Sequence, residues 1–147
     1  PPSPDLRVMA VSGEAADPLL VSAQLEQELL QFEPSWRHVE TRLVSIDRPG
    51  ANAMLLTDLP DLYLVDQPSF IRLYRMGYLL ELTEWDTYGL DVSGSSLMNV
   101  LGLSAEQRRG PIIAAVSRTS ARAEHATRLL RRYASDGLHS VHDALTR

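Results

Sequence analysis

The sequence predicts an α/β protein in three layers, with a mainly parallel sheet of about four strands covered by helices. Short apolar runs, typical of strands that are buried on both faces, alternate with stretches in which apolar residues recur at helical spacing. Polar turns follow these runs directly. The length of 147 residues suits one domain and is sufficient to bury a core.

The stretch from 59 to 82 carries most of this prediction. Leu62–Val65 is a short apolar run that stops at Asp66, so it predicts a buried parallel strand. Asp66 or Gln67 can cap a helix that begins at once, over Ser69–Met76. The residues that define the inner face and the end of this helix are Phe70, Ile71, Tyr74 and Gly77.

The N-terminal third predicts a strand, a helix and a second strand. The first strand is Leu6–Val11, and Asp17 caps a helix over Pro18–Glu33. Polar and apolar residues alternate over His38–Ile46, which predicts the second strand. A short helix is expected over residues 50–57. The stripe that would lie on the sheet is Val21, Leu25, Leu29 and Phe32.

The C-terminal part predicts a last strand within Pro111–Ser117, followed by a helix over Ala121–Ala134 that Ser120 caps. We expect the strand order 2-1-3, with Ile112–Val116 added at the far edge in either direction. The inner face of the helix is Ala123, Ala126, Leu130 and Tyr133. A final short amphipathic helix is expected to contain Leu138, Val141 and Leu145.

The segment between these parts, residues 83–110, has little pattern. Ser93–Ser96 has the composition of a flexible join. A short helix is expected from Ser96 or Leu97 to Leu101, and Ser104 with Gln107 would form a capping box for one more turn.

The order of these parts resembles the first lobe of the extracellular solute-binding proteins of ABC importers, especially the carbohydrate-binding branch that includes maltodextrin-binding protein. Pro60-Asp61 before a strand, and Met76–Leu82 after the helix, match phrases of that family. Residues 6–82 and 111–147 resemble the two parts of the lobe, and residues 83–110 stand where the second lobe would be. The resemblance implies a periplasmic-binding-protein-like single lobe.

The resemblance also implies a sugar site at the turns after the first and third strands. These turns would be neighbours at the carboxyl edge of the sheet, where carboxylates and amides can bind vicinal hydroxyls. For Asp66, capping of the following helix is a second interpretation, compatible with ligand contact. The expected ligand residues are Ser12, Gly13, Glu14, Asp66, Gln67 and Ser69.

Aromatic side chains could stack on a sugar ring, and Tyr74 and Trp85 are the candidates. Trp36 and Tyr88 could do the same. Packing in the core or at the edge of the lobe is the alternative for all four, and Trp85 and Tyr88 could also cover the surface left by the second lobe.

Other chemistry has little support in the sequence. The net charge of −5 and the absence of a basic run argue against nucleic acid, and the lack of cysteine excludes thiol chemistry and disulfides. Catalytic motifs such as G-x-S-x-G and H-E-x-x-H are missing, so we expect no enzyme and no cofactor. A surface helix explains the only metal candidates better than a zinc site does; these are His125, His139, His142 and Asp143.

We therefore expect an extracellular or periplasmic solute-binding-like protein, with a lipid anchor as a further option and residues 1–5 as an extended tether. Its partners would be a sugar and an ABC permease, or a second copy bound through the former interlobe face. The alternative function is a degenerate lobe that acts as a protein-interaction or dimerisation module without binding sugar. No apolar run of membrane-spanning length occurs.

Overall fold

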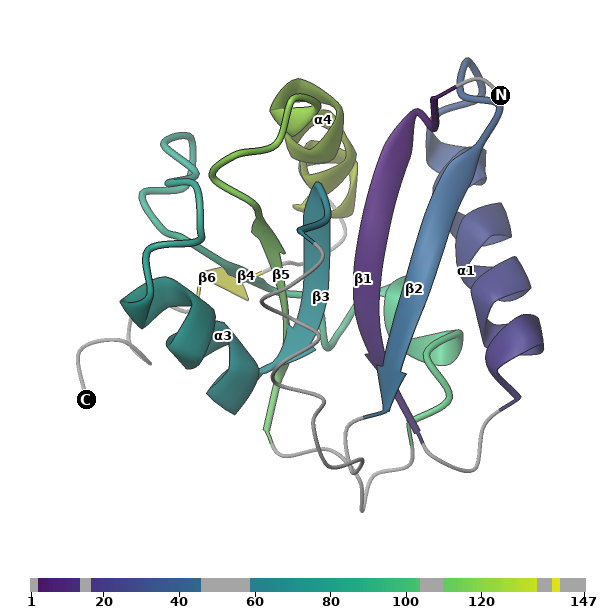
Figure 1. Cartoon of the computed structure of the whole chain (residues 1–147), viewed down its shortest axis with the longest axis horizontal. Helices are drawn as coiled ribbons and strands as arrows, with labels where there is room; N and C mark the ends of the chain where they lie inside the picture. The colour runs from purple at the N-terminus through teal and green to yellow at the C-terminus, as the bar shows by residue number, and fades with distance from the viewer. Residues whose placement is uncertain (1–2, 14–16, 46–58, 104–109, 135–138, 141–147) are drawn as a thin grey trace.

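The protein forms one sheet with helices on both of its faces (Figure 1). The computed structural model describes residues 3–13, 17–45, 59–103, 110–134 and 139–140. The strands in these ranges are β1 (Leu6–Ser12), β2 (Val39–Ser45), β3 (Leu62–Asp66), β4 (Leu90–Asp91), β5 (Ile112–Val116) and β6 (His139–Ser140). The helices there are α1 (Pro18–Phe32), α3 (Gln67–Arg75) and α4 (Ala123–Ala134), with a 3-10 turn η1 (Ser96–Asn99).

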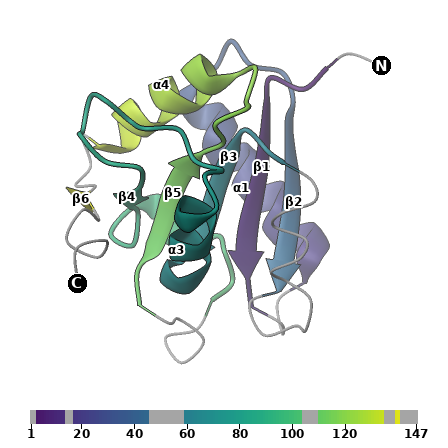
Figure 2. The same cartoon turned by 60° about the vertical axis from the view of Figure 1, so that its left-hand side comes forward.

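The strand order is β2-β1-β3-β5-β4-β6 over the described residues. Helices α1 and α4 lie on one face, whereas α3 covers the other (Figure 2). The predicted α/β class is confirmed, and so are the strands β1, β2, β3 and β5 to within one or two residues.

The sheet is mixed, so the prediction of a mainly parallel sheet is wrong. β1 pairs in parallel with β2 and β3, but the pairs β3–β5, β5–β4 and β4–β6 are antiparallel. β5 also lies inside the sheet instead of at its far edge. The reason is that β4 and β6 contribute two residues each, which is too short to leave a strand period in the sequence.

The unit of β3 and α3 forms as the sequence predicts. All five residues of β3 are buried, the helix starts at the next residue, and Gly77 ends it with φ +78°. The inner face of α3 differs from the prediction, because Ser69, Phe70 and Leu73 are buried while Tyr74 is exposed. The buried face of the helix is turned toward Phe70, whose ring lies against Gly89, just before β4, and beside Ile113 of β5.

Helix α1 begins at its predicted cap. The carboxylate of Asp17 accepts a hydrogen bond from the N–H of Leu19 at 3.1 Å. The buried face is Val21, Leu25 and Leu29, as predicted.

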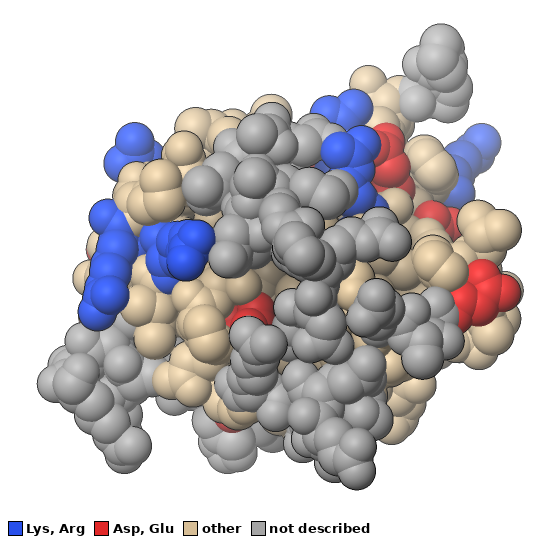
Figure 3. Space-filling view, turned by 60° about the horizontal axis from the view of Figure 1, so that its bottom comes forward, with Lys and Arg blue, Asp and Glu red and all other residues tan. Residues whose placement is uncertain are grey.

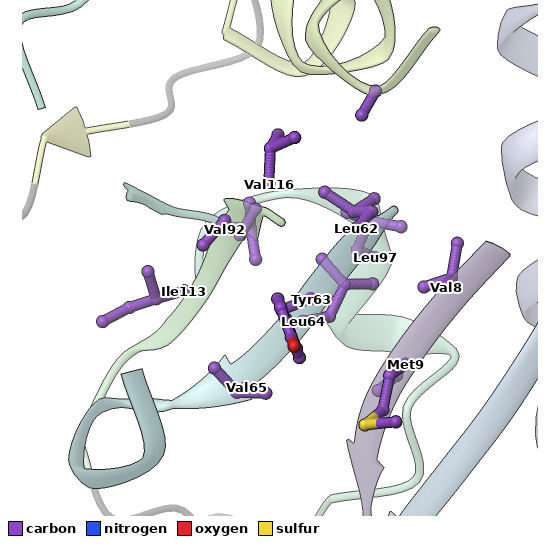
Figure 4. Close-up of a cluster of buried hydrophobic side chains, with 14 of the residues drawn as sticks. Val8, Met9, Leu62, Tyr63, Leu64, Val65, Val92, Leu97, Ile113 and Val116 are labelled. Carbon is purple, nitrogen blue, oxygen red and sulfur yellow. The ribbon is translucent and has the colours of Figure 1, made fainter. Parts of the chain in front are cut away.

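The described part of the segment between Leu82 and β5, residues 83–103, contributes to the core, and Ser93–Ser96 is held by hydrogen bonds instead of forming a flexible join. The buried residues Val92 and Leu97 lie in the same cluster as β3 and β5 (Figure 4). Two of the serines in this segment fix its backbone by hydrogen bonds. Ser95 Oγ donates to the carbonyl of Val92 (2.7 Å), and Ser93 Oγ accepts from the N–H of Ile112 (2.9 Å).

Asp5 precedes β1, and its carboxylate accepts hydrogen bonds from the N–H groups of Arg37 (2.8 Å) and His38 (3.0 Å), which lower the pKa of that carboxyl. One expectation in the C-terminal part is corrected. His139 and Ser140, expected in a last helix, pair with β4. The remainder of that helix, the helix over 50–57 and the capping box at Ser104 lie outside the described residues.

Asp61 joins three segments that are distant in the sequence. Its buried carboxylate accepts hydrogen bonds from the N–H of Arg7 (2.8 Å) and the hydroxyl of Ser120 (2.6 Å), and it pairs with Arg122 at 3.5 Å. Its own N–H donates to the carbonyl of Arg7, while its carbonyl accepts from the N–H of Ser117. The starts of β1, β3 and α4 are thereby fixed together.

Replacement of Asp61 by Ala should lower the free energy of unfolding by about 2–4 kcal/mol, because buried donors lose a charged acceptor. Asp61→Asn, which keeps one carbonyl, should cost less. The control is Glu84→Ala, which removes an exposed ion pair with Arg131 (2.7 Å) and should cost at most about 1 kcal/mol. Urea unfolding measures all three, and equal losses for Asp61→Ala and Glu84→Ala would contradict the assignment.

Gly89 should not tolerate a side chain. A Cβ there would lie 2.5 Å from Phe70 Cε1 and 2.7 Å from Ile113 Cγ2, so Gly89→Ala should destabilise the protein by about 1–3 kcal/mol. At Gly94 a Cβ would meet nothing within 4 Å, so Gly94→Ala should be neutral or slightly stabilising. Thermal unfolding of the two variants distinguishes a packed segment from a loose one, for which both changes would be harmless.

Candidate functional site

Polar residues end the three parallel strands at their carboxyl edge, which is the lower end of the sheet in Figure 1. Ser12 at the end of β1 pairs with Ser45 at the end of β2. β1 pairs with β3 as far as Ala10 and Leu64, and the two parallel strands end in Ser12 and Asp66 at the same edge of the sheet. The two strands that precede the expected ligand turns therefore end at one edge of the sheet.

The first turn of α3 adds two of the predicted ligand residues to this edge. Ser69 is buried, and Gln67 is half-buried. Gln67 Oε1 lies next to Gly110, at 3.2 Å from the position that a Cβ of Gly110 would take. Gly110 has φ +91°, so the chain enters β5 close to this helix end without a side chain in the way.

Two buried oxygen atoms at this edge have no partner among the residues that the structure describes. Asp66 is 4% exposed, and neither its Oδ1 nor the buried Oγ of Ser45 forms a hydrogen bond with any of those residues. Asp66 occupies the capping position of α3, yet its side chain makes no capping bond, so capping does not account for it. Such atoms are costly to leave unsatisfied, and a ligand hydroxyl can satisfy them.

The other predicted residues are placed as follows. Gly13 is buried at the end of β1, and Glu14 lies outside the described residues. Tyr74 and Trp85 do not join the polar residues. Tyr74 lies near the opposite end of α3, in edge-to-face contact with Tyr88 at 4.9 Å between ring centroids.

The two tryptophans serve packing in the structure. Trp85 is half-buried against the hydrophobic core in the turn after Leu82, and Trp36 is 7% exposed with its ring 5.4 Å from that of His125. Neither lies at the carboxyl edge of the parallel strands. No stacking platform for a sugar ring is therefore formed by the four aromatic residues considered from the sequence.

The sequence analysis missed Ser45. The signal was present, since Ser45 is the last polar residue of the predicted second strand and parallel strands end at one edge. Figure 3 turns this edge toward the viewer and shows basic side chains gathered on its left side, where α3 lies in Figure 1. Helix α3 contributes the exposed Arg72 and Arg75.

Other kinds of site find no support among the residues described. They contain no group of three potential ligands that could hold a metal ion. Of the histidines considered for zinc, His125 has its Nδ1 at 2.8 Å from the carbonyl of Asp5, and His142 lies outside the described ranges. No described helix is both long and apolar enough to cross a membrane.

Comparisons with family models, curated proteins and solved structures find no significant match. The likeness to solute-binding proteins consequently rests on the residues of this chain alone.

Proposed function

We propose that the protein binds a hydroxyl-rich small solute, such as a sugar, at the carboxyl edge of β1, β2 and β3. It would be an extracytoplasmic, three-layer lobe of the solute-binding type, with a binding and not a catalytic role. The observation that carries the proposal is the buried Oδ1 of Asp66, which has no partner among the described residues and lies at the edge where open α/β sheets bind ligands.

The chemistry of the edge fits a polyol. Asp66 Oδ1 can accept a hydrogen bond from a hydroxyl, Ser45 Oγ can donate or accept, and Gln67 offers an amide in the adjoining turn. Two neighbouring hydroxyls of a sugar can each donate and accept a hydrogen bond, so one ligand can bind several of these polar atoms at once. The described residues of this edge include no aromatic ring on which a sugar could stack, so hydrogen bonds would supply most of the specificity.

A single lobe would bind by one face only. In the family that the sequence resembles, two lobes close around the solute and the closed form engages an ABC permease. One lobe supplies about half of those contacts and leaves the ligand partly hydrated, so we expect weak binding. Delivery to a permease would need a second surface to cover the solute.

Asp66→Asn tests the proposal. We expect it to weaken binding of an oligosaccharide by about tenfold, because a charged acceptor becomes a neutral one. The melting temperature should not fall, since Asp66 makes no capping bond in the free protein. The matched control is Asp86→Asn, which removes the same charge at an exposed turn residue whose φ of 52° asparagine also adopts.

The measurement is calorimetric titration of wild type and both variants with a panel of oligosaccharides. The proposal fails if the wild type binds none of them at millimolar concentration, or if Asp86→Asn weakens binding as much as Asp66→Asn does.

A second candidate function is self-association through the same edge. Leu19 and Leu20, in the first turn of α1, are 82% and 55% exposed. Helix α1 runs back from the carboxyl edge, so these leucines lie beside the face that a second lobe would cover. This observation favours the interaction module over a sugar receptor.

The two candidates give different sedimentation results. If the module is correct, the wild type should dimerise and Leu19→Glu with Leu20→Glu should abolish the dimer without affecting folding, because both side chains are exposed. The control is Gln27→Glu, an exposed position further along α1. A wild type that remains monomeric at high concentration would eliminate the module.

A further inference from the structure

The extended segment Leu79–Leu82, which follows α3, has backbone hydrogen bonds with the described residues on one of its two sides only. Every second N–H group of this segment donates a hydrogen bond. Leu80 donates to a carbonyl at the end of β5 (2.8 Å), and Leu82 donates to the carbonyl of Thr87 (2.7 Å). In an extended chain alternate residues direct their backbone groups to opposite sides, so those of Leu79 and Glu81 point away from β5.

The backbone groups on that outward side are unused. The N–H and C=O of Leu79 and Glu81 form no hydrogen bond with any part of the chain that is described. Such a row of free donors and acceptors can pair with another extended chain. Figure 2 shows the loop after α3 at the outer end of the molecule, on the β5 side of the sheet.

A hollow lies on each side of this edge, and Leu80 borders both. The hollow on the α3 side has a volume of about 380 Å³ and is lined by Tyr74, Tyr88, Arg75 and Arg118 among others. The hollow on the α4 side measures about 250 Å³ and contains Thr127, Arg128 and Arg131. Successive side chains of an added strand point to opposite faces, so they would enter the two hollows in turn.

The charge of the two hollows is positive on a chain whose net charge is −5. They contain four arginines against Glu81 and Glu124. Arg131 is paired with Glu84, whereas Arg75, Arg118 and Arg128 form no ion pair within the described ranges. A partner with carboxylates would therefore find unpaired cations on both sides of the edge.

We propose that Leu79–Glu81 binds an extended, acidic segment of a partner protein by strand addition. Its main chain would pair with the free groups of Leu79 and Glu81, and its alternate side chains would fill the two hollows. A second copy of this chain is a poorer occupant, because two-fold pairing along one edge would place the arginines of both copies together. This surface is independent of the sugar proposal.

The probe is a fluorescent peptide of alternating valine and glutamate, added to the full chain. We expect a rise in fluorescence anisotropy that is lost in high salt, and none with the valine–lysine peptide. Amide hydrogen exchange should slow at Leu79 and Glu81 on binding, while Leu80 and Leu82, which are already bonded, should change little. N-methylation of alternate amides of the peptide should abolish binding.

Arg118→Glu should lower the affinity for the valine–glutamate peptide by roughly fivefold to tenfold, as expected for one reversed charge at an exposed pair. Arg37→Glu makes the same change at an exposed position outside both hollows and should leave affinity unchanged. Circular dichroism verifies that each variant is folded.

Three results would overturn the proposal. The first is equal binding of the lysine peptide. The second is binding without protection of Leu79 and Glu81, which would place the peptide elsewhere. The third is protection of these amides by raised protein concentration alone, which would make a second copy the occupant.

Discussion

The hydrogen bonds of Asp61 are the constraint on which the rest of the structure depends. This one residue joins the start of β1, 54 positions earlier, to the start of α4, 59 positions later. Burial of a carboxylate is costly unless its oxygens are satisfied, and in Asp61 both are, by a backbone N–H, a hydroxyl and a guanidinium. Only a few arrangements of β1, β3 and α4 place all three donors around this carboxylate, so Asp61 helps to determine how these elements are aligned.

β3 begins and ends next to an aspartate, and the two have opposite surroundings. Asp61 precedes the strand and Asp66 closes it, and each is 4% exposed. Asp61 has a partner for both oxygens, whereas Oδ1 of Asp66 has none in the part of the chain that the structure describes. The same residue type thus stabilises the fold at one end, and at the other end it leaves an acceptor that a ligand can use.

The sequence was a good guide where local pattern and burial agree. The short apolar run of β3, the cap at Asp17 and the left-handed Gly77 were all predictable, because each follows from residue type and spacing. The pairing of β4 with β6 was not predictable, because a strand of two residues is too short to show the alternation of polar and apolar residues. Their position depends on β5, whose neighbours are set by contacts distant in the sequence.

The candidate site was predictable to a similar degree. Ser12, Asp66 and Ser69 do reach one edge, because parallel strands joined by helices end there. The aromatic residues were harder to place. Tyr74 and Leu73 are adjacent on α3, and which of them is buried depends on how Phe70 packs against Gly89. That contact is tertiary, and it removed Tyr74 from the expected sugar site.

The two proposed surfaces lie at opposite ends of α3, and the packing of this helix bears on whether they communicate. Its nine residues span roughly 13 Å, from Gln67 at the carboxyl edge to Arg75 at the outer hollow. Coupling would require the helix to have a second packed position. Phe70 fits so closely over Gly89 that not even a methyl group can be inserted, which leaves no room for a shift toward the sheet. Binding at one end should therefore leave affinity at the other unchanged, and the helix acts as a fixed spacer between them.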